Sequence, residues 1–240
     1  MNQPTEKGEF PMRINKYLAS KQYSTRKGAD EIIKEKKVFI NGRLAVLGDK
    51  VGATDNVEVR FRGKIKPRLY FAYNKPRGIV THSAEDKDKE IKDVLPVKDV
   101  FPIGRLDKDS HGLIILTNDG RITERLLGPE YAHEKEYKVK TKNKLRSSFK
   151  EKMERGVDIG ETKTAPCKVE ILSSDVFKII LTEGKKHQIR RMCEALFQEV
   201  EDLERIRVMN IKLHNLKTGK HRAIAGPELV TFLRLLGLTE

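Results

Sequence analysis

Residues 104–120 restrict the possible folds of this chain more than any other segment. Their sequence is Gly-Arg-Leu-Asp-Lys-Asp-Ser-His-Gly-Leu-Ile-Ile-Leu-Thr-Asn-Asp-Gly. A charged loop runs directly into the apolar residues 113–117, and an Asn-Asp-Gly turn follows. A short apolar run between two turn signals predicts a buried strand. The loop before it holds Arg105 and Asp107 at the rim of a rigid sheet, where active sites are commonly built. Asp107 is therefore the first candidate for a functional carboxylate.

The chain has a large excess of positive charge. Its 240 residues include 49 Lys and Arg against 35 Asp and Glu, which gives a formal net charge of +14. Residues 1–68 hold +8 of this charge, from 16 basic and 8 acidic side chains. Such a surface favours a polyanionic partner, because cations that neutralise phosphates release bound counterions. We expect the amino-terminal segment to be the electrostatic anchor.

The sequence lacks the signals of membrane, secreted and metal-binding proteins. No apolar run approaches the roughly 20 residues that span a membrane, and the first residues lack the apolar stretch of a signal peptide. Cys167 and Cys193 stand alone, without the spacing of a metal site. We expect a cytoplasmic protein with no membrane segment and no metal, in which both cysteines are small core residues.

Residues 12–60 predict a compact unit of two helices and short strands. Ile14 and Leu18 follow the spacing of one buried helical face, and residues 29–33 repeat that spacing. Asn41-Gly42 predicts a hairpin turn, because both residues tolerate a positive φ. The basic side chains outside the apolar helical faces form a surface of their own.

This unit resembles the S4 RNA-binding domain over nearly its full length. The matching features, in order, are Arg-Ile-Asn-Lys-Tyr-Leu-Ala at residues 13–19, Ser-Thr-Arg at 24–26, Val-Phe-Ile-Asn-Gly at 38–42, and residues 48–59. The second helix of that family has the nucleic-acid face, so Arg26 and Lys27 are the best candidates for RNA contacts. Arg13, Lys16 and Lys34 are further candidates on the same basic surface.

A change of composition divides the chain at residues 61–68. In this segment, Gly63 and Pro67 break regular structure and four basic residues keep it solvated. We predict a tail over residues 1–11, the S4-like domain over residues 12–60, a basic linker over residues 61–68 and a second domain over residues 69–240.

The second domain alternates predicted strands and helices. The predicted strands are residues 69–73, 113–117, 137–140, 167–172, 176–181 and 208–213, and the predicted helices are residues 121–127, 145–155, 185–197 and 227–236. This order is typical of an α+β fold with a largely antiparallel mixed sheet flanked by helices.

Four strings of the second domain resemble the pseudouridine synthases, in the branch typified by RsuA and RluB. Gly-Arg-Leu-Asp at residues 104–107 matches the motif whose aspartate is essential in that family. The other three are Lys-Pro-Arg-Gly at residues 75–78, Lys-Glu-Tyr-Lys-Val at 135–139, and Glu-Gly-Lys-Lys-His-Gln-Ile-Arg-Arg-Met at 183–192. The resemblance covers residues 12–230. It is closest to the RluF-like subgroup, whose members modify large-subunit ribosomal RNA.

The resemblance implies an isomerase that converts a specific uridine of 23S (large-subunit) ribosomal RNA to pseudouridine, with no cofactor and as a monomer. Its substrate would be the RNA alone or the RNA in a pre-ribosomal particle. The catalytic residues it implies are Asp107, Tyr137 and Arg190, and the residues around the base are Arg105, Ile189, Lys75 and Pro76. Arg190 would pair with Asp107 and lower its pKa. Arg105 would fill the space that the flipped base leaves.

Two alternatives stay open. The same isomerase could act on 16S rRNA or a tRNA, because recognition of folded RNA is spread over many surface contacts. The chain could also be a ribosome-assembly protein that binds rRNA and has lost catalysis. One departure from the subgroup is that no long basic tail follows residues 238–240, which leaves open the RNA contacts that such a tail would supply.

Overall fold

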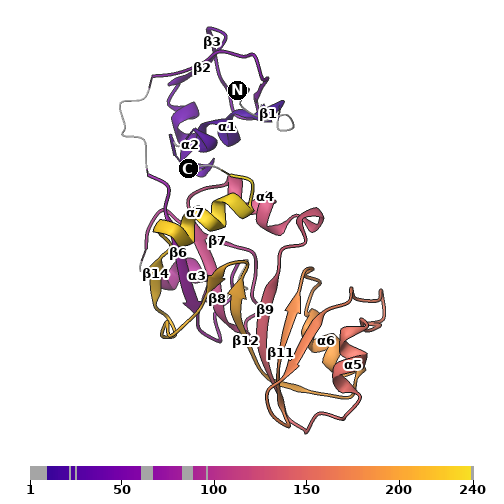
Figure 1. The fold of residues 1–240 in the computed structure, drawn as a ribbon. Helices are drawn as coiled ribbons and strands as arrows, with labels where there is room; N and C mark the ends of the chain where they lie inside the picture. Colours follow the sequence, from indigo (N-terminus) through magenta and orange to yellow (C-terminus); the bar gives the residue numbers. More distant parts are fainter. Residues whose placement is uncertain are drawn as a thin grey trace. The chain divides into compact units, whose positions relative to one another are not determined.

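The structure is a computed structural model that describes residues 10–21, 23, 24, 26–60, 67–82, 89–95 and 97–238, except for the side chain of Lys27. The chain forms two compact units (Figure 1). The first contains residues 1–69 and 118–121, and the second contains residues 70–117 and 122–240. Each unit has a buried apolar core of its own.

Within its described residues, the first unit forms two helices and two small antiparallel sheets. The helices are α1 (Ile14–Ser20) and α2 (Arg26–Lys34); β2 (Val38–Ile40) pairs with β3 (Arg43–Leu44) and β5 (Val57–Val59), and β1 (Met12–Arg13) pairs with β4 (Lys50–Val51). Ile14 and Leu18 of α1 are buried together with Ile32 and Ile33 of α2. These contacts confirm the buried helical faces that the spacing predicts.

The turn between β2 and β3 has the predicted conformation. The φ angle is 50° at Asn41 and 79° at Gly42, and the flanking residues Ile40 and Arg43 are paired across the hairpin. Two consecutive positive φ angles give the turn whose twist matches that of the strands. This match explains why Asn and Gly stand at these positions.

Two boundaries of the first unit differ from the sequence prediction. Phe10, which we assigned to the tail, packs against the core of the unit. Pro67, which we assigned to the linker, accepts a hydrogen bond from the Asn118 side chain at 2.9 Å. Residues 1–9 and 61–66 of these two segments lie outside the described residues.

The second unit is built on a mixed sheet, to which its described part contributes nine strands. Its order is β10-β11-β9-β12-β8-β6-β14, with β13 paired to β12 and β7 paired to β8. The strands are β6 (Tyr70–Lys75), β7 (Phe101–Ile103), β8 (His111–Thr117), β9 (Lys135–Thr141), β10 (Lys168–Ile171), β11 (Val176–Leu181), β12 (Val200–Val208), β13 (Ile211–Lys212) and β14 (His221–Ala223). Among the described strands of this sheet only β8 and β12 run parallel, so the predicted largely antiparallel α+β class is confirmed.

Helices cover the two ends of the sheet separately. They are α3 (Ile91–Val94), α4 (Arg121–Leu127), the 3-10 helix η1 (Pro129–Tyr131), α5 (Phe149–Glu154), α6 (Gln188–Ala195) and α7 (Gly226–Leu235). In Figure 1, α5 and α6 lie beside β11, and α7 lies across the end that contains β6 and β14. One core contains Ile115, Leu126 and Phe232, whereas another contains Phe177, Ile189 and Met192.

Gly112 allows β8 and β12 to run side by side. A Cβ atom at this position would lie 2.4 Å from the carbonyl oxygen of Arg205 in β12. The φ angle of Gly112 is also 102°, a value that side chains oppose. Only glycine fits here. Its close approach brings the end of the Asp107 loop next to the backbone of Arg205 in β12.

Both cysteines contribute to packing. Cys193 is fully buried in the core under α6, and burial raises its pKa to about 12. Cys167 packs against the same core, and burial raises its pKa to about 11.

In the described part of the chain, every helix is too short or too polar to cross a membrane.

Candidate active site

The loop between β7 and β8 holds Asp107 in a fixed backbone frame. The backbone N–H of Leu106 donates to the Thr81 hydroxyl at 3.1 Å, and that hydroxyl donates to the Leu106 carbonyl at 2.8 Å. The N–H of Ser110 donates to the Asp107 carbonyl at 3.1 Å. The Asp107 side chain is 37% exposed. The backbone is thus anchored while the carboxylate remains accessible, as a reacting group requires.

Lys75 lies beneath this loop. Its ammonium donates to the carbonyls of Ser110 at 2.8 Å, Asp107 at 3.1 Å and Pro76 at 3.1 Å, and the residue is fully buried. Burial lowers the pKa of Lys75 to about 8. The contact of Lys75 and Pro76 with the base stays a prediction; in the free protein, carbonyls already occupy three donors of the Lys75 ammonium. Lys75 thereby ties the loop to the end of β6.

The buried Lys75 predicts a stability change at alkaline pH. Its pKa of about 8 lies below the ordinary 10.5, so between these values the native chain has released a proton that the unfolded chain retains. The free energy of unfolding then rises with pH. We expect the wild type to gain up to about 3 kcal/mol relative to Lys75→Met across this window. Urea denaturation of both proteins at several pH values tests this, and a constant difference would contradict it.

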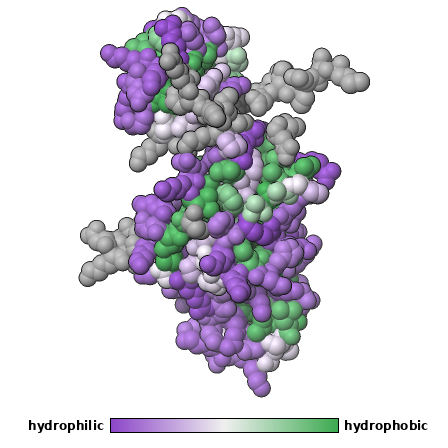
Figure 2. All heavy atoms as spheres, turned by 90° about the vertical axis from the view of Figure 1, so that its left-hand side faces the viewer, coloured by the Kyte–Doolittle hydropathy of each residue, from purple (hydrophilic) through white to green (hydrophobic). Residues whose placement is uncertain are grey.

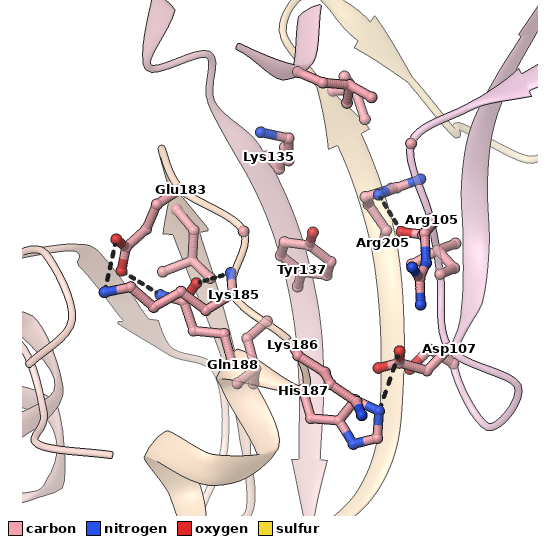
Figure 3. A pocket seen from close by; sticks show the side chains of 18 of the residues that line it. Arg105, Asp107, Lys135, Tyr137, Glu183, Lys185, Lys186, His187, Gln188 and Arg205 are labelled. Carbon is pink, nitrogen blue, oxygen red and sulfur yellow. Dashed lines mark hydrogen bonds and ion pairs between the residues drawn. The ribbon is translucent and has the colours of Figure 1, made fainter. Parts of the chain in front are cut away.

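A pocket of about 610 Å³ opens beside the loop (Figure 3). Ile103, Ile115 and Leu126 of one core line it on one side, and Leu181 and Ile189 of the other core line it as well. Of the predicted site residues, the pocket brings together Arg105, Asp107, Tyr137, Ile189 and Arg190; Lys75 and Pro76 are outside its described lining. The pocket is therefore at the junction of two rigid cores.

The pocket wall is strongly basic. The Lys and Arg residues among the lining are Arg105, Lys135, Lys185, Lys186, Arg190 and Arg205, whereas the carboxylates are Asp107 and Glu183. Six positive minus two negative charges leave +4, without His187. A concave surface with this charge attracts anions such as phosphate groups.

Tyr137 stands in the middle of the wall. It belongs to β9, where it is paired with Arg205 of β12 on one side and with Ile179 of β11 on the other. Its half-buried ring points into the pocket between Lys135 and Asp107 (Figure 3). An aromatic face at this place can stack on a planar ligand, and its hydroxyl can form a hydrogen bond.

The turn into α6 brings the His187 imidazole toward Asp107. Gln188 donates to the Glu183 carboxylate at 2.6 Å and accepts a hydrogen bond from the N–H of Lys185 at 2.9 Å. His187 follows with a φ of 52°, and its Nε2 lies 3.6 Å from an Asp107 carboxylate oxygen. The carboxylate therefore faces an imidazole in the free protein.

Arg190 lies beside the same loop with a different contact. Its guanidinium donates to the carbonyls of Asp109 at 3.3 Å and Val200 at 3.4 Å. Both bonds are longer than usual. In the free protein, Arg190 thus contacts the backbone carbonyl of Asp109 in place of the predicted ion pair with Asp107.

Arg205 was not predicted, although it is a buried part of the wall. Its guanidinium donates to the carbonyl of Leu113 at 2.6 Å and to that of Arg105 at 3.4 Å. It supports the loop from the side of β12, whereas the Arg105 side chain itself is exposed. The sequence prediction began this strand at Val208 and so left Arg205 outside it.

Two further residues of the site were also missed, and the sequence held a signal for each. Lys135 precedes Tyr137 by two residues, and this spacing puts both side chains on the same face of a strand. His187 lies within the string at residues 183–192 and directly before the helix. Both residues could therefore have been predicted from neighbouring residues in the sequence, without knowledge of contacts between distant parts of the chain.

The basic residues predicted for RNA binding lie in the first unit. Arg13 and Arg26 are exposed, Lys16 is partly buried, and Lys34 is exposed and forms an ion pair with Glu31 at 2.9 Å. The side chain of Lys27 lies outside the described part of the structure.

Comparisons with known proteins agree with both units. A family model described as RNA pseudouridylate synthase matches residues 69–195, and a model of the S4 domain matches residues 12–57. The dual-specificity RNA pseudouridine synthase RluF of Salmonella typhi is 41% identical over 230 residues, which cover 93% of this chain and 79% of that protein. The ribosomal large subunit pseudouridine synthase B of Bacillus subtilis is 36% identical, over 93% of this chain and 96% of that protein.

A solved structure supports the same assignment. A crystal structure of a pseudouridylate synthase superposes with a TM-score of 0.65 at 28% identity, over 89% of this chain and 96% of that one. The family match includes the Asp107 loop, Tyr137 and Arg190. The chain belongs to the RNA pseudouridylate synthase family, with an S4 domain at its amino-terminal side.

Proposed function

We propose that this chain converts a specific uridine of large-subunit ribosomal RNA to pseudouridine in the pocket around Asp107. The main support is an accessible carboxylate, that of Asp107, at the rim of a basic pocket that also contains Tyr137 and Arg190. The names of the relatives support the substrate, since one is a dual-specificity RNA enzyme and another is a large-subunit enzyme. We also propose that it acts in the cytoplasm, as a monomer and without a cofactor.

Asp107 acts at C1′ of the target nucleotide. The reaction breaks the N1–C1′ bond, turns the uracil in place and joins C5 to C1′, with no change of oxidation state. The carboxylate either attacks C1′ or removes a proton from the sugar. Its exposure and its anchored loop suit both routes.

The other pocket residues hold and orient the reactants. Tyr137 stacks on the flipped uracil, and Ile189 forms an apolar wall beside it. Arg190 moves from the Asp109 carbonyl onto the Asp107 carboxylate when the nucleotide is bound. Arg105, which is exposed at the pocket rim, enters the stack from which the base was removed.

The S4 unit supplies RNA affinity in this proposal. Its candidate contacts are the basic residues Arg13, Lys16, Arg26, Lys27 and Lys34. They would bind phosphates, since Lys and Arg contacts of this kind position the RNA without reading sequence. Lys34 contributes less than the others if it keeps its ion pair with Glu31.

Deleting residues 1–66 should weaken RNA binding and reduce its salt dependence. The truncated chain retains Pro67 and Leu69, both bonded to the Asn118 side chain, so we expect it to stay folded. Each lost phosphate contact changes the slope of log K against log salt by about 0.7 on single strands. Filter binding from low to high salt measures the slope. An unchanged slope would show that the S4 unit does not bind the RNA.

Tritium release tests the function and its alternatives together. Purified protein is incubated with C5-tritiated large-subunit rRNA, small-subunit rRNA or tRNA, because joining C5 to C1′ releases the label. We expect release from large-subunit rRNA. Release only from small-subunit rRNA or tRNA would replace the proposed substrate. No release, together with tight rRNA binding, would support the ribosome-assembly protein.

A further inference from the structure

Lys135 is a basic residue of the pocket to which the proposed reaction assigns no part. It is half-buried, and its ammonium donates to the carbonyl of His133 at 3.3 Å. No carboxylate of the described residues forms an ion pair with it. Lys140 on the same strand pairs with Glu201, and Lys185 of the pocket pairs with Glu183. Lys135 therefore faces the pocket without a counterion among the described residues.

The surroundings of Lys135 do not favour its charge. It is paired in register with Val208 of β12 and Leu181 of β11, both of which line the pocket. Burial lowers its pKa, and the nearby Arg205 guanidinium lowers it further. A desolvated cation is costly unless a partner compensates it. At this place, a bound ligand is the partner that the pocket can offer.

The position of Lys135 relative to Tyr137 indicates which atom of the ligand lies next to the Lys135 ammonium. The two side chains lie on the same face of β9, about 7 Å apart along the strand. Figure 3 shows Asp107 on one side of Tyr137 and Lys135 on the other. When the sugar lies at Asp107 and the base on Tyr137, Lys135 faces the ring atom opposite the glycosidic bond. In uridine this atom is C4, with the carbonyl oxygen O4.

We propose that Lys135 donates a hydrogen bond to the carbonyl oxygen of the target base farthest from the sugar and stabilises the uracil anion that leaves C1′. The inference rests on the proposed function. When the N1–C1′ bond breaks, its electron pair stays with the base and is delocalised onto O2 and O4. The cation lies where this negative charge develops, and such an arrangement speeds bond cleavage.

The same contact serves the substrate and the product. A half-turn of uracil about its N3–C6 axis exchanges N1 with C5 and O4 with O2. Lys135 therefore meets O4 before the rotation and O2 after it, and both are acceptors. C5 then joins C1′ and loses its proton. Cytosine presents an amino group at C4, which cannot accept from an ammonium. Lys135 is thus also expected to select uracil over cytosine.

Single-turnover kinetics of Lys135→Met tests the proposal. We expect the rate to fall about 100-fold, as for the loss of one donor to a developing anion, with RNA affinity and melting temperature unchanged. Lys135→Arg should recover part of the rate because it keeps a cationic donor. Lys138→Met is the matched control, since Lys138 is an exposed residue on the other face of β9, and its rate should stay within about threefold of wild type.

A better leaving group distinguishes this role from a structural one. Fluorine at C5 withdraws electrons, so the anion of 5-fluorouracil needs less stabilisation. The rate at which the unrearranged target nucleoside is lost is measured for the wild type and for Lys135→Met, once with uridine and once with 5-fluorouridine at the target. The factor by which Lys135→Met slows this loss should be at least about tenfold smaller with 5-fluorouridine than with uridine. An equal deficit for both substrates would overturn the inference, as would a rate near wild type with uridine. If the wild type itself forms no pseudouridine, the proposed function fails instead.

Discussion

Asp107→Asn should lower the single-turnover rate by at least about 10,000-fold, because it removes the group that acts at C1′. The amide keeps the size of the side chain, so the anchored loop at Leu106 and Ser110 should not change. RNA affinity should be retained or slightly increased, since one negative charge is removed near phosphate. Tritium release and filter binding measure the two quantities on the same RNA.

Asp109→Asn is the matched control. Asp109 is an exposed carboxylate two residues away in the same loop, and only its backbone carbonyl contacts Arg190. We expect this variant to react at a rate within a few-fold of wild type. Turnover by Asp107→Asn clearly above about 0.01 percent of wild type would contradict the assignment of Asp107 as the reacting group.

Arg190→Ala should have the second largest effect, a decrease of about 1,000-fold in the single-turnover rate. The change removes the cation that orients the Asp107 carboxylate in the bound state, and it removes the hydrogen bond to the Asp109 carbonyl. Both losses act on the position of one reacting group, and misplacement by about 1 Å can lower a rate 100-fold. RNA affinity should fall much less than the rate.

Arg191→Ala separates this role from general basic charge. Arg191 is adjacent, but its guanidinium contacts the Ile159 carbonyl at 2.5 Å and Glu161 at 3.7 Å, away from Asp107. We expect its single-turnover rate to stay within about fivefold of wild type. A reversed order of the two variants would show that Arg191 is the partner of Asp107. Equal rates for Arg190→Ala and wild type would leave His187 as the partner.

Local patterns in the sequence were sufficient for much of the fold. The helix at residues 121–127 and the strand at residues 176–181 have the predicted ends. The buried faces of α1 and α2 and the Asn41-Gly42 turn also follow from spacing and from allowed φ angles. These features depend on residues that are close together in the chain.

The central strand β12 could not be predicted because its environment is set by distant residues. Val200–Arg207 contains mostly charged side chains, which is unusual for the middle of a sheet. Arg205 is nevertheless buried, since the carbonyls of Leu113 and Arg105 accept its hydrogen bonds. The close approach at Gly112 makes these contacts possible. Such a strand becomes apparent only when its neighbours are in place.

The same distinction applies to the site. Asp107, Tyr137 and Arg190 were predicted from ordered motifs, and the structure brings all three to one pocket. The partner of the Asp107 carboxylate in the free protein was not predicted, because it depends on the left-handed conformation of His187. The place of Lys75 under the loop was not predicted either, because it depends on the carbonyls of Asp107 and Ser110, which are more than 30 residues further along the chain.

Mapping of pseudouridine in cellular RNA tests directly whether this chain modifies large-subunit rRNA by means of Asp107. Total RNA from cells that lack this chain is compared with RNA from the same cells supplied with wild type or with Asp107→Asn. Carbodiimide treatment followed by primer extension marks each pseudouridine as a stop. We expect a stop in large-subunit rRNA that is absent without the chain and is restored by wild type alone. Identical stops in all three RNAs, or restoration by Asp107→Asn, would contradict it.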